Sequence, residues 1–82
     1  MNSDSDKTFL EFFGKNLKAV RLRKEVTQKE LAFSLGMEIS QISRIERGLI
    51  NTGIANVYRI ARFLQVHPKE LFEFTVPAGR QK

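Results

Sequence analysis

The chain has 82 residues, and its 14 Lys and Arg against 9 Asp and Glu give a formal net charge of +5 and a sequence pI near 10. This length fits one domain with one modest core, and the lack of cysteine together with a single histidine excludes disulfide bonds, thiol nucleophiles and a cysteine or histidine metal centre. No stretch approaches the ~20 consecutive apolar residues of a membrane span, and the start lacks the pattern of a signal peptide, so we expect a cytoplasmic protein without a membrane partner. The positive excess favours a polyanionic partner.

The first predicted helix starts at Thr8, because Thr8 and Glu11 have the spacing of an N-terminal capping box. It ends at about Lys24. The apolar residues that recur on its buried face are Phe9, Phe13, Leu17 and Val20. Phe12 projects elsewhere and is either partly exposed or covered by another element. Residues 1–7 are polar with nothing to bury, so we expect a disordered leader there.

Two short helices are predicted on either side of a glycine turn. Thr27 and Glu30 repeat the capping-box spacing, which predicts a second helix over about residues 28–35. Gly36 can adopt the left-handed backbone conformation that ends this helix. Helical spacing of apolar residues then predicts a third helix over about residues 39–47.

Gly48 ends the third helix, and a short loop leads to an amphipathic fourth helix over about residues 54–64. A proline at the first position predicts a fifth, short helix over about residues 68–74. Residues 77–82 form a basic tail. No segment shows the alternation of a β-strand, so the predicted fold class is all-α, a compact five-helix domain over residues 8–76.

Residues 28–47 have the internal spacing of a helix-turn-helix. Ala32 is small enough for the second and third helices to cross closely, and Gly36 makes the sharp turn between them. Ile42 and Ile45 anchor the third helix on the second. The other faces of the third helix stay polar, so it can enter the major groove of duplex DNA, which is wide enough to admit a helix.

Three segments carry a resemblance to a known family: TQKELA (27–32), SRIERG (43–48) and IARFLQV (60–66). They resemble the phage-repressor and Cro-type (Xre-like) helix-turn-helix family. Because almost nothing lies outside the DNA-binding domain, the chain also looks like the restriction-modification controller proteins. The resemblance implies a lambda-repressor-like fold and a sequence-specific, DNA-binding transcriptional regulator without cofactor or small-molecule ligand.

The resemblance places the residues that read bases on the third helix. They are Ile39, Ser40 and Arg44, with Gln41 and Ser43 as second candidates. Arginine can bond both O6 and N7 of guanine, serine can bond a base edge or a phosphate, and isoleucine can pack on a thymine methyl group. The alternative is that Arg44 and Gln41 are solvated face residues and that Ile39 is partly buried.

Contacts to the DNA backbone are expected at both ends of the helix-turn-helix. The resemblance assigns Gln28 to phosphate positioning, and we expect Arg47, Asn51 and Thr52 to add to it because they lie near the N-terminus of the fourth helix, whose backbone amides can bind a phosphate. A basic run also lies on and beyond the first helix, and it is either a solvated face or a further set of phosphate contacts. Its members are Lys15, Lys18, Arg23, Lys24 and Lys29.

Arg21 and Glu46 match a charged pair with which the family ties the first helix to the end of the third. We expect a partly buried ion pair that orients the helices more than it stabilises them, because desolvation offsets much of the attraction. The alternative is two exposed charges. Three residues depart from the family pattern: Glu25 and Gln65 stand where glycine is frequent, which predicts corners that are either strained or differently shaped, and Glu38 stands where serine or threonine usually caps the third helix.

A single recognition helix covers only a few base pairs. Specific affinity generally requires two copies on half-sites about one turn apart, roughly 34 Å, so we expect a homodimer on a near-palindromic operator. The residues predicted for its interface are Leu71, Phe72, Phe74 and Val76. Alternatively, Leu71 and Phe72 complete the core of the monomer. Regulation would act through dimerisation and operator occupancy, including autoregulation, and activation would add RNA polymerase as a partner.

The alternative function is an antitoxin-like protein-interaction module with secondary DNA binding, whose C-terminal patch covers a partner protein. Salt-dependent DNA binding by the isolated protein would favour the regulator, whereas stable co-purification with a toxin or an enzyme would favour the module. We do not expect an enzyme, because one histidine, no cysteine and no glycine-rich phosphate loop leave no constellation for nucleophilic, metal or phosphoryl-transfer chemistry.

Overall fold

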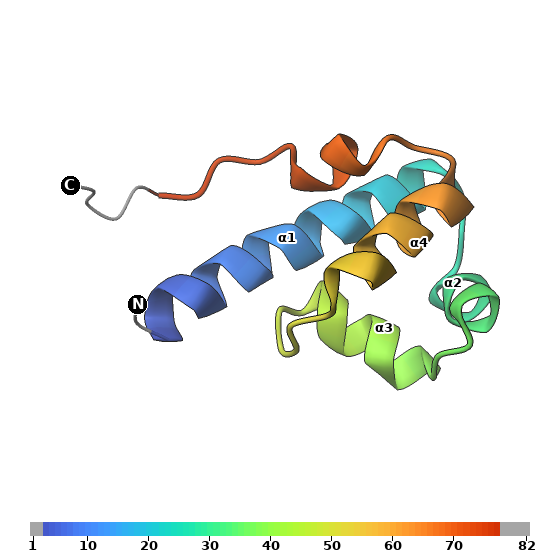
Figure 1. The fold of residues 1–82 in the computed structure, drawn as a ribbon, viewed down its shortest axis with the longest axis horizontal. Helices are drawn as coiled ribbons and strands as arrows, with labels where there is room; N and C mark the ends of the chain where they lie inside the picture. Colours follow the sequence, from blue (N-terminus) through green and yellow to red (C-terminus); the bar gives the residue numbers. More distant parts are fainter. Residues whose placement is uncertain (1–2, 78–82) are drawn as a thin grey trace.

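The computed structural model describes residues 3–77, and every secondary-structure element in that range is helical. In chain order the elements are α1 (Ser3–Arg23), α2 (Gln28–Leu35), α3 (Ile39–Glu46), α4 (Ile54–Leu64) and the 3-10 turn η1 (Pro68–Phe72). The long α1 packs against α3 and η1, while α2 packs against α3 and α4 (Figure 1). The all-α prediction is confirmed for this part of the chain.

The predicted fifth α-helix is wrong, because the segment forms only the short 3-10 turn η1 and leaves it after Phe72. Pro68 occupies the first position of the turn, and His67 and Glu70 make a reciprocal cap at its start. An element of this length gains too few backbone hydrogen bonds to propagate as an α-helix.

Within the described residues, no helix is both long enough and apolar enough to cross a membrane.

The first helix begins earlier than predicted. α1 starts at Ser3, so Thr8 lies inside the helix and does not cap it, and the predicted leader is helical from residue 3 onward. Asp4 and Asp6 in the first turn interact favourably with the positive end of the helix dipole, which explains why polar residues extend the helix here. Residues 1–2 of the leader and 78–82 of the basic tail lie outside the described residues.

One apolar core joins all five elements. Its buried members are Phe13, Leu17, Val20, Leu31, Ala32, Leu35, Ile42, Ile45, Val57, Ile60, Ala61, Leu64 and Leu71. Ala32 lies in it at 1% exposure, as its small side chain predicts for a close crossing of α2 and α3. Leu71 is fully buried, so its predicted place in a dimer interface is wrong and the alternative, that it completes the monomer's core, is confirmed.

The segment after η1 lies along α1 through aromatic contacts. The Phe74 ring stacks on Phe12 with centroids 6.2 Å apart and tilts against Phe9 at 5.5 Å. Phe72 contacts Phe13 at 5.2 Å but remains 39% exposed. Phe12 is therefore partly covered by the segment after η1 and stays half-buried, so each of the two alternatives left open by the sequence holds in part.

Two glycines bring α1 into backbone contact with the end of α3. A Cβ atom on Gly14 would lie only 2.5 Å from the carbonyl oxygen of Ile45, and one on Gly48 would lie 2.7 Å from the Cα atom of Glu11. Gly48 also has a φ of +74°, which side-chain-bearing residues rarely adopt. The local sequence pattern marks Gly48 only as a helix stop and gives no sign of the close approach at Gly14.

The corners after α1 and α4 are built by residues other than glycine. Glu25 has a φ of 59° and Gln65 a φ of 58°, so both adopt the left-handed conformation. The backbone amide of Val26 bonds to Arg21 O at 3.1 Å, and that of Val66 bonds to Ala61 O at 3.0 Å. The two departures predicted to strain these corners therefore occupy positive-φ positions that cost a non-glycine residue about 1–2 kcal/mol.

Candidate nucleic-acid interface

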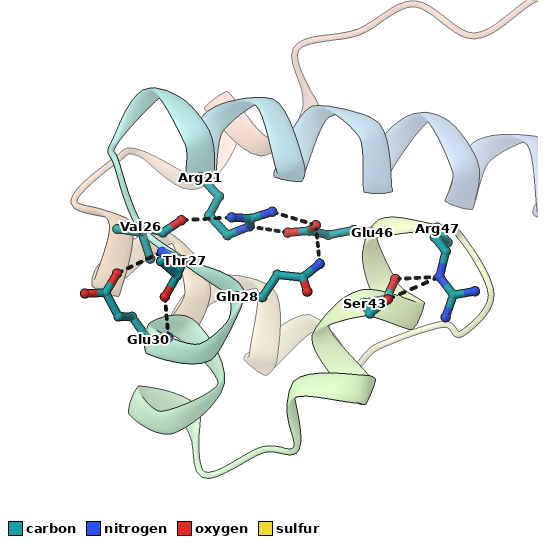
Figure 2. Close-up of polar contacts among 8 residues, drawn as sticks. All are labelled: Arg21, Val26, Thr27, Gln28, Glu30, Ser43, Glu46 and Arg47. Carbon is teal, nitrogen blue, oxygen red and sulfur yellow. Dashed lines mark hydrogen bonds and ion pairs between the residues drawn. The ribbon is translucent and has the colours of Figure 1, made fainter.

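The start of α2 is fixed by a reciprocal cap. The amide of Glu30 donates to Thr27 Oγ1 at 3.0 Å, and the amide of Thr27 donates to Glu30 Oε1 at 2.8 Å (Figure 2). At the other end, Gly36 takes a left-handed conformation with a φ of 68°. Both signals are local in the sequence, and together they define the first half of the helix-turn-helix.

α3 divides sharply into a buried and an exposed side. Ile42 and Ile45 are fully or almost fully buried against the rest of the domain. Ile39, Ser40 and Arg44 are exposed on the other side. The structure therefore brings the three first-rank base-reading candidates together on one accessible face, and Ile39, at 46% exposure, is not buried against α2.

The two second-rank candidates have partners inside the protein. The backbone amide of Glu38 donates to Gln41 Oε1 at 3.0 Å, so the Gln41 side chain is held at the start of α3. Arg47 Nε donates to Ser43 Oγ at 3.2 Å (Figure 2). Gln41 and Ser43 are each half-buried, whereas the guanidinium-bearing Arg47 is exposed. The side chains of Gln41 and Ser43 consequently have less freedom to face a base than those of Ser40 and Arg44.

A buried ion pair connects α1 to the end of α3. Arg21 Nε lies 2.5 Å from Glu46 Oε2, and Arg21 Nη2 donates to Glu46 Oε1 at 3.0 Å. Each residue is only 5% exposed. Arg21 Nη1 also donates to Val26 O at 2.8 Å, which ties the network to the corner before α2 (Figure 2). The expected pairing is present, and the alternative of two exposed charges is wrong.

Gln28 belongs to the same network. Its Nε2 donates to Glu46 Oε1 at 3.0 Å, and its side chain is half-buried (Figure 2). The first residue of α2 is thereby linked to the last residue of α3. The sequence pattern assigned Gln28 to phosphate contact and gave no sign of this internal hydrogen bond.

The remaining backbone-contact candidates lie in the loop between α3 and α4. Asn51 is exposed, while Thr52 is half-buried and its Oγ1 accepts from Asn56 Nδ2 at 3.0 Å. The loop leads to Gly53, the N-cap of α4. These residues therefore follow the end of the helix-turn-helix and lead into the N-terminus of α4.

A glycine-cornered helix pair with one face buried and the other presenting serine and arginine defines a helix-turn-helix DNA-binding domain. A family model described as helix-turn-helix (HTH_3) matches residues 17–71, and the chain belongs to this family. The prediction of an Xre-like helix-turn-helix protein is confirmed, and with it the class of DNA-binding transcriptional regulators.

The proteins that this chain is similar to include two that are named as controller proteins. Control protein C.BamHI of Bacillus amyloliquefaciens is 39% identical over 64 residues, which cover 77% of this chain and 79% of that protein. The crystal structure of the restriction-modification controller protein C.AhdI of Aeromonas hydrophila matches with a TM-score of 0.73 and 36% identity over 77% of this chain and 96% of that chain. An HTH_3 family transcriptional regulator of Vibrio cholerae matches with a TM-score of 0.74 and 25% identity, covering 82% of this chain and 38% of that one. The predicted similarity to controller proteins is confirmed.

Proposed function

We propose that the protein binds a near-palindromic operator as a homodimer and controls transcription within a restriction-modification system, including transcription of its own gene. The observation that carries the proposal is the division of α3, on which Ile39, Ser40 and Arg44 face outward while the opposite side is held in the core. The similarity of the chain to two proteins named as controllers supports its assignment to a restriction-modification system.

Recognition would combine base contacts from α3 with backbone contacts on either side of it. Arg44 supplies two parallel donors for guanine, Ser40 a hydroxyl for a base edge, and Ile39 an apolar surface for a thymine methyl group. Gln28 at the start of α2, with Arg47 and the loop residues Asn51 and Thr52, would contact phosphates and set the register of the helix in the groove. Such contacts add affinity without reading sequence.

Arg44→Ala should weaken binding to the operator by about 5- to 150-fold, because a bidentate contact to guanine is worth about 1–3 kcal/mol. The operator is first obtained by selecting bound duplexes from a random pool, and affinities are then measured by fluorescence anisotropy. Arg62→Ala, which removes an exposed arginine on α4, is the matched control and should bind normally. Equal affinity of the two variants for the operator would show that Arg44 does not contact a base. A selection that does not enrich any duplex sequence over the starting pool would refute the proposed function.

The dimer face that we propose combines apolar residues of the C-terminal segment with an apolar groove. Phe72 lines this groove together with Phe9, Ile50 and Ile54, around a cavity of about 230 Å³. Ile54 is 77% exposed, although it is a large apolar side chain at the first position of α4. An exposed apolar groove of this kind is typical of a surface that another protein covers. Phe74 and Val76, both half-buried, extend the same proposed face.

Ile54→Asp should convert the dimer to a monomer without unfolding it. The Ile54 side chain contributes little to the core, and an acidic residue in the first turn of α4 interacts favourably with the positive end of the helix dipole. Sedimentation equilibrium at micromolar concentration measures the mass, with 9.5 kDa for one chain. Phe33→Asp, at an 89% exposed position on α2 outside the groove, is the control and should remain dimeric. A wild-type protein with the mass of one chain, alone and on DNA, would exclude the dimer.

A further inference from the structure

The structure separates the members of the basic run that the sequence left together. Arg23 Nη2 pairs with Glu70 Oε1 at 3.1 Å, so its charge is directed toward η1. Lys15 and Lys18, three residues apart on α1, instead share one face of the helix and line a polar cleft. These two lysines therefore differ from Arg23 in their surroundings.

The cleft lies where α1 meets the start of α2 and the end of α3. Lys15 and Lys18 form its α1 side, Gln28 contributes from α2, and Ser43 and Arg47 contribute from α3. Its volume is about 530 Å³, which leaves room for a phosphate group. Figure 2 shows how Gln28, Ser43 and Arg47 lie relative to one another beneath α1.

The charge balance of the cleft favours an anion. Lys15, Lys18 and Arg47 are exposed and carry three positive charges. Of the two acidic residues that line the cleft, Glu46 has both carboxylate oxygens bonded to Arg21. Glu11 alone then opposes the three cations. Ammonium and guanidinium groups around a hydroxyl provide the donors that a phosphate oxygen requires.

We infer that this cleft binds a phosphate of the DNA backbone and that Lys15 and Lys18 are the residues that clamp it. Ser43 and Arg47 lie one helical turn beyond Ser40 and Arg44 on α3, so the cleft adjoins the face proposed to read bases. A strand whose bases contact that face would pass its phosphates along the mouth of the cleft. The inference rests on the proposed DNA binding and adds α1 to the elements that hold the duplex.

The test measures the salt dependence of binding by the full chain to the selected operator duplex. Lys15→Gln and Lys18→Gln should each reduce the slope of log affinity against log salt by about 1 between about 50 and 200 mM, because each phosphate contact releases condensed counterions. Sequence preference in a repeated selection should not change, since phosphates carry no sequence information. Lys18→Arg keeps the charge and should keep the wild-type slope.

Lys69→Gln on η1 is the matched control, because it removes the same charge from an exposed residue outside the cleft. Slopes for Lys15→Gln and Lys18→Gln equal to that of the control would overturn the inference while leaving the proposed function intact. Failure of the wild-type protein to bind the duplex would overturn the proposed function itself, and the inference with it.

Discussion

Glu46→Ala is expected to destabilise the protein by about 3–5 kcal/mol, because the substitution leaves the Arg21 guanidinium buried without its carboxylate. The substitution also removes the acceptor of Gln28 Nε2. Urea denaturation followed by circular dichroism measures the loss as a lower free energy of unfolding. Since the same carboxylate links α1, α2 and α3, the variant should also bind DNA more weakly at temperatures where it is still folded.

Arg23→Ala is the matched control, because it removes an arginine from an exposed pair whose side chains are 59% and 32% accessible. Exposed pairs contribute about 0.2–1 kcal/mol, so this variant should lose far less stability. The double variant Arg21→Met/Glu46→Leu separates the two roles of the buried pair. It should regain much of the lost stability, since apolar replacements of a buried pair are often neutral or better, but its DNA binding should stay impaired. Equal stability of Glu46→Ala and Arg23→Ala would contradict a buried structural pair.

Gly14→Ala should lower the free energy of unfolding by at least about 2 kcal/mol, even though alanine is the better helix former by about 1 kcal/mol. The added methyl group would overlap the carbonyl groups of Ile45 and Glu46, which are backbone atoms and cannot rotate away. α1 and α3 would therefore have to separate, and the face that we propose to read bases would move with α3. Urea denaturation gives the change in stability, and anisotropy with the operator gives the change in binding.

Gly53→Ala is the comparison for this effect, because a Cβ atom at that position would meet no atom within 4 Å and the backbone φ is an ordinary −70°. Its cost should stay below about 1 kcal/mol, the usual size of an N-cap change. The sign of the change in stability for Gly14→Ala shows whether the close approach of α1 and α3 outweighs the higher helix propensity of alanine. An increase in stability would mean that helix propensity outweighs the close approach and that α1 and α3 are not in backbone contact.

Features encoded by neighbouring residues were predictable. The Thr27 and Glu30 cap and the Gly36 turn depend on side chains within a few positions of each other, so the sequence predicted α2 and the start of the turn correctly. The outward direction of Ser40 and Arg44 follows from the helical spacing of Ile42 and Ile45 in the same way. Family resemblance added the pairing of Arg21 with Glu46, which are far apart in sequence.

Features that depend on distant segments were missed or misplaced. Gly14 looks like a weak helix residue until α3 is placed against it, and the only sequence signal was a glycine inside an otherwise strong helical pattern. The start of α1 at Ser3 was missed because polar residues without a buried face resemble a loop, although an existing helix extends at little cost. The sequence left Leu71 open between a dimer face and the monomer's core, because its burial under α1 and α4 cannot be seen from local periodicity.

The buried face of α3 contributes to the stability of the domain, whereas its exposed face is free to vary with little effect on folding. Substitutions at exposed sites away from caps and cores usually change stability by less than about 0.5 kcal/mol, and Ser40 and Arg44 are such sites. Different side chains there would redirect the same scaffold to another target while its melting temperature stayed nearly constant. If α3 reads bases as proposed, the preferred DNA sequence can therefore diverge, or be reprogrammed in the laboratory, without compensating changes elsewhere in the chain.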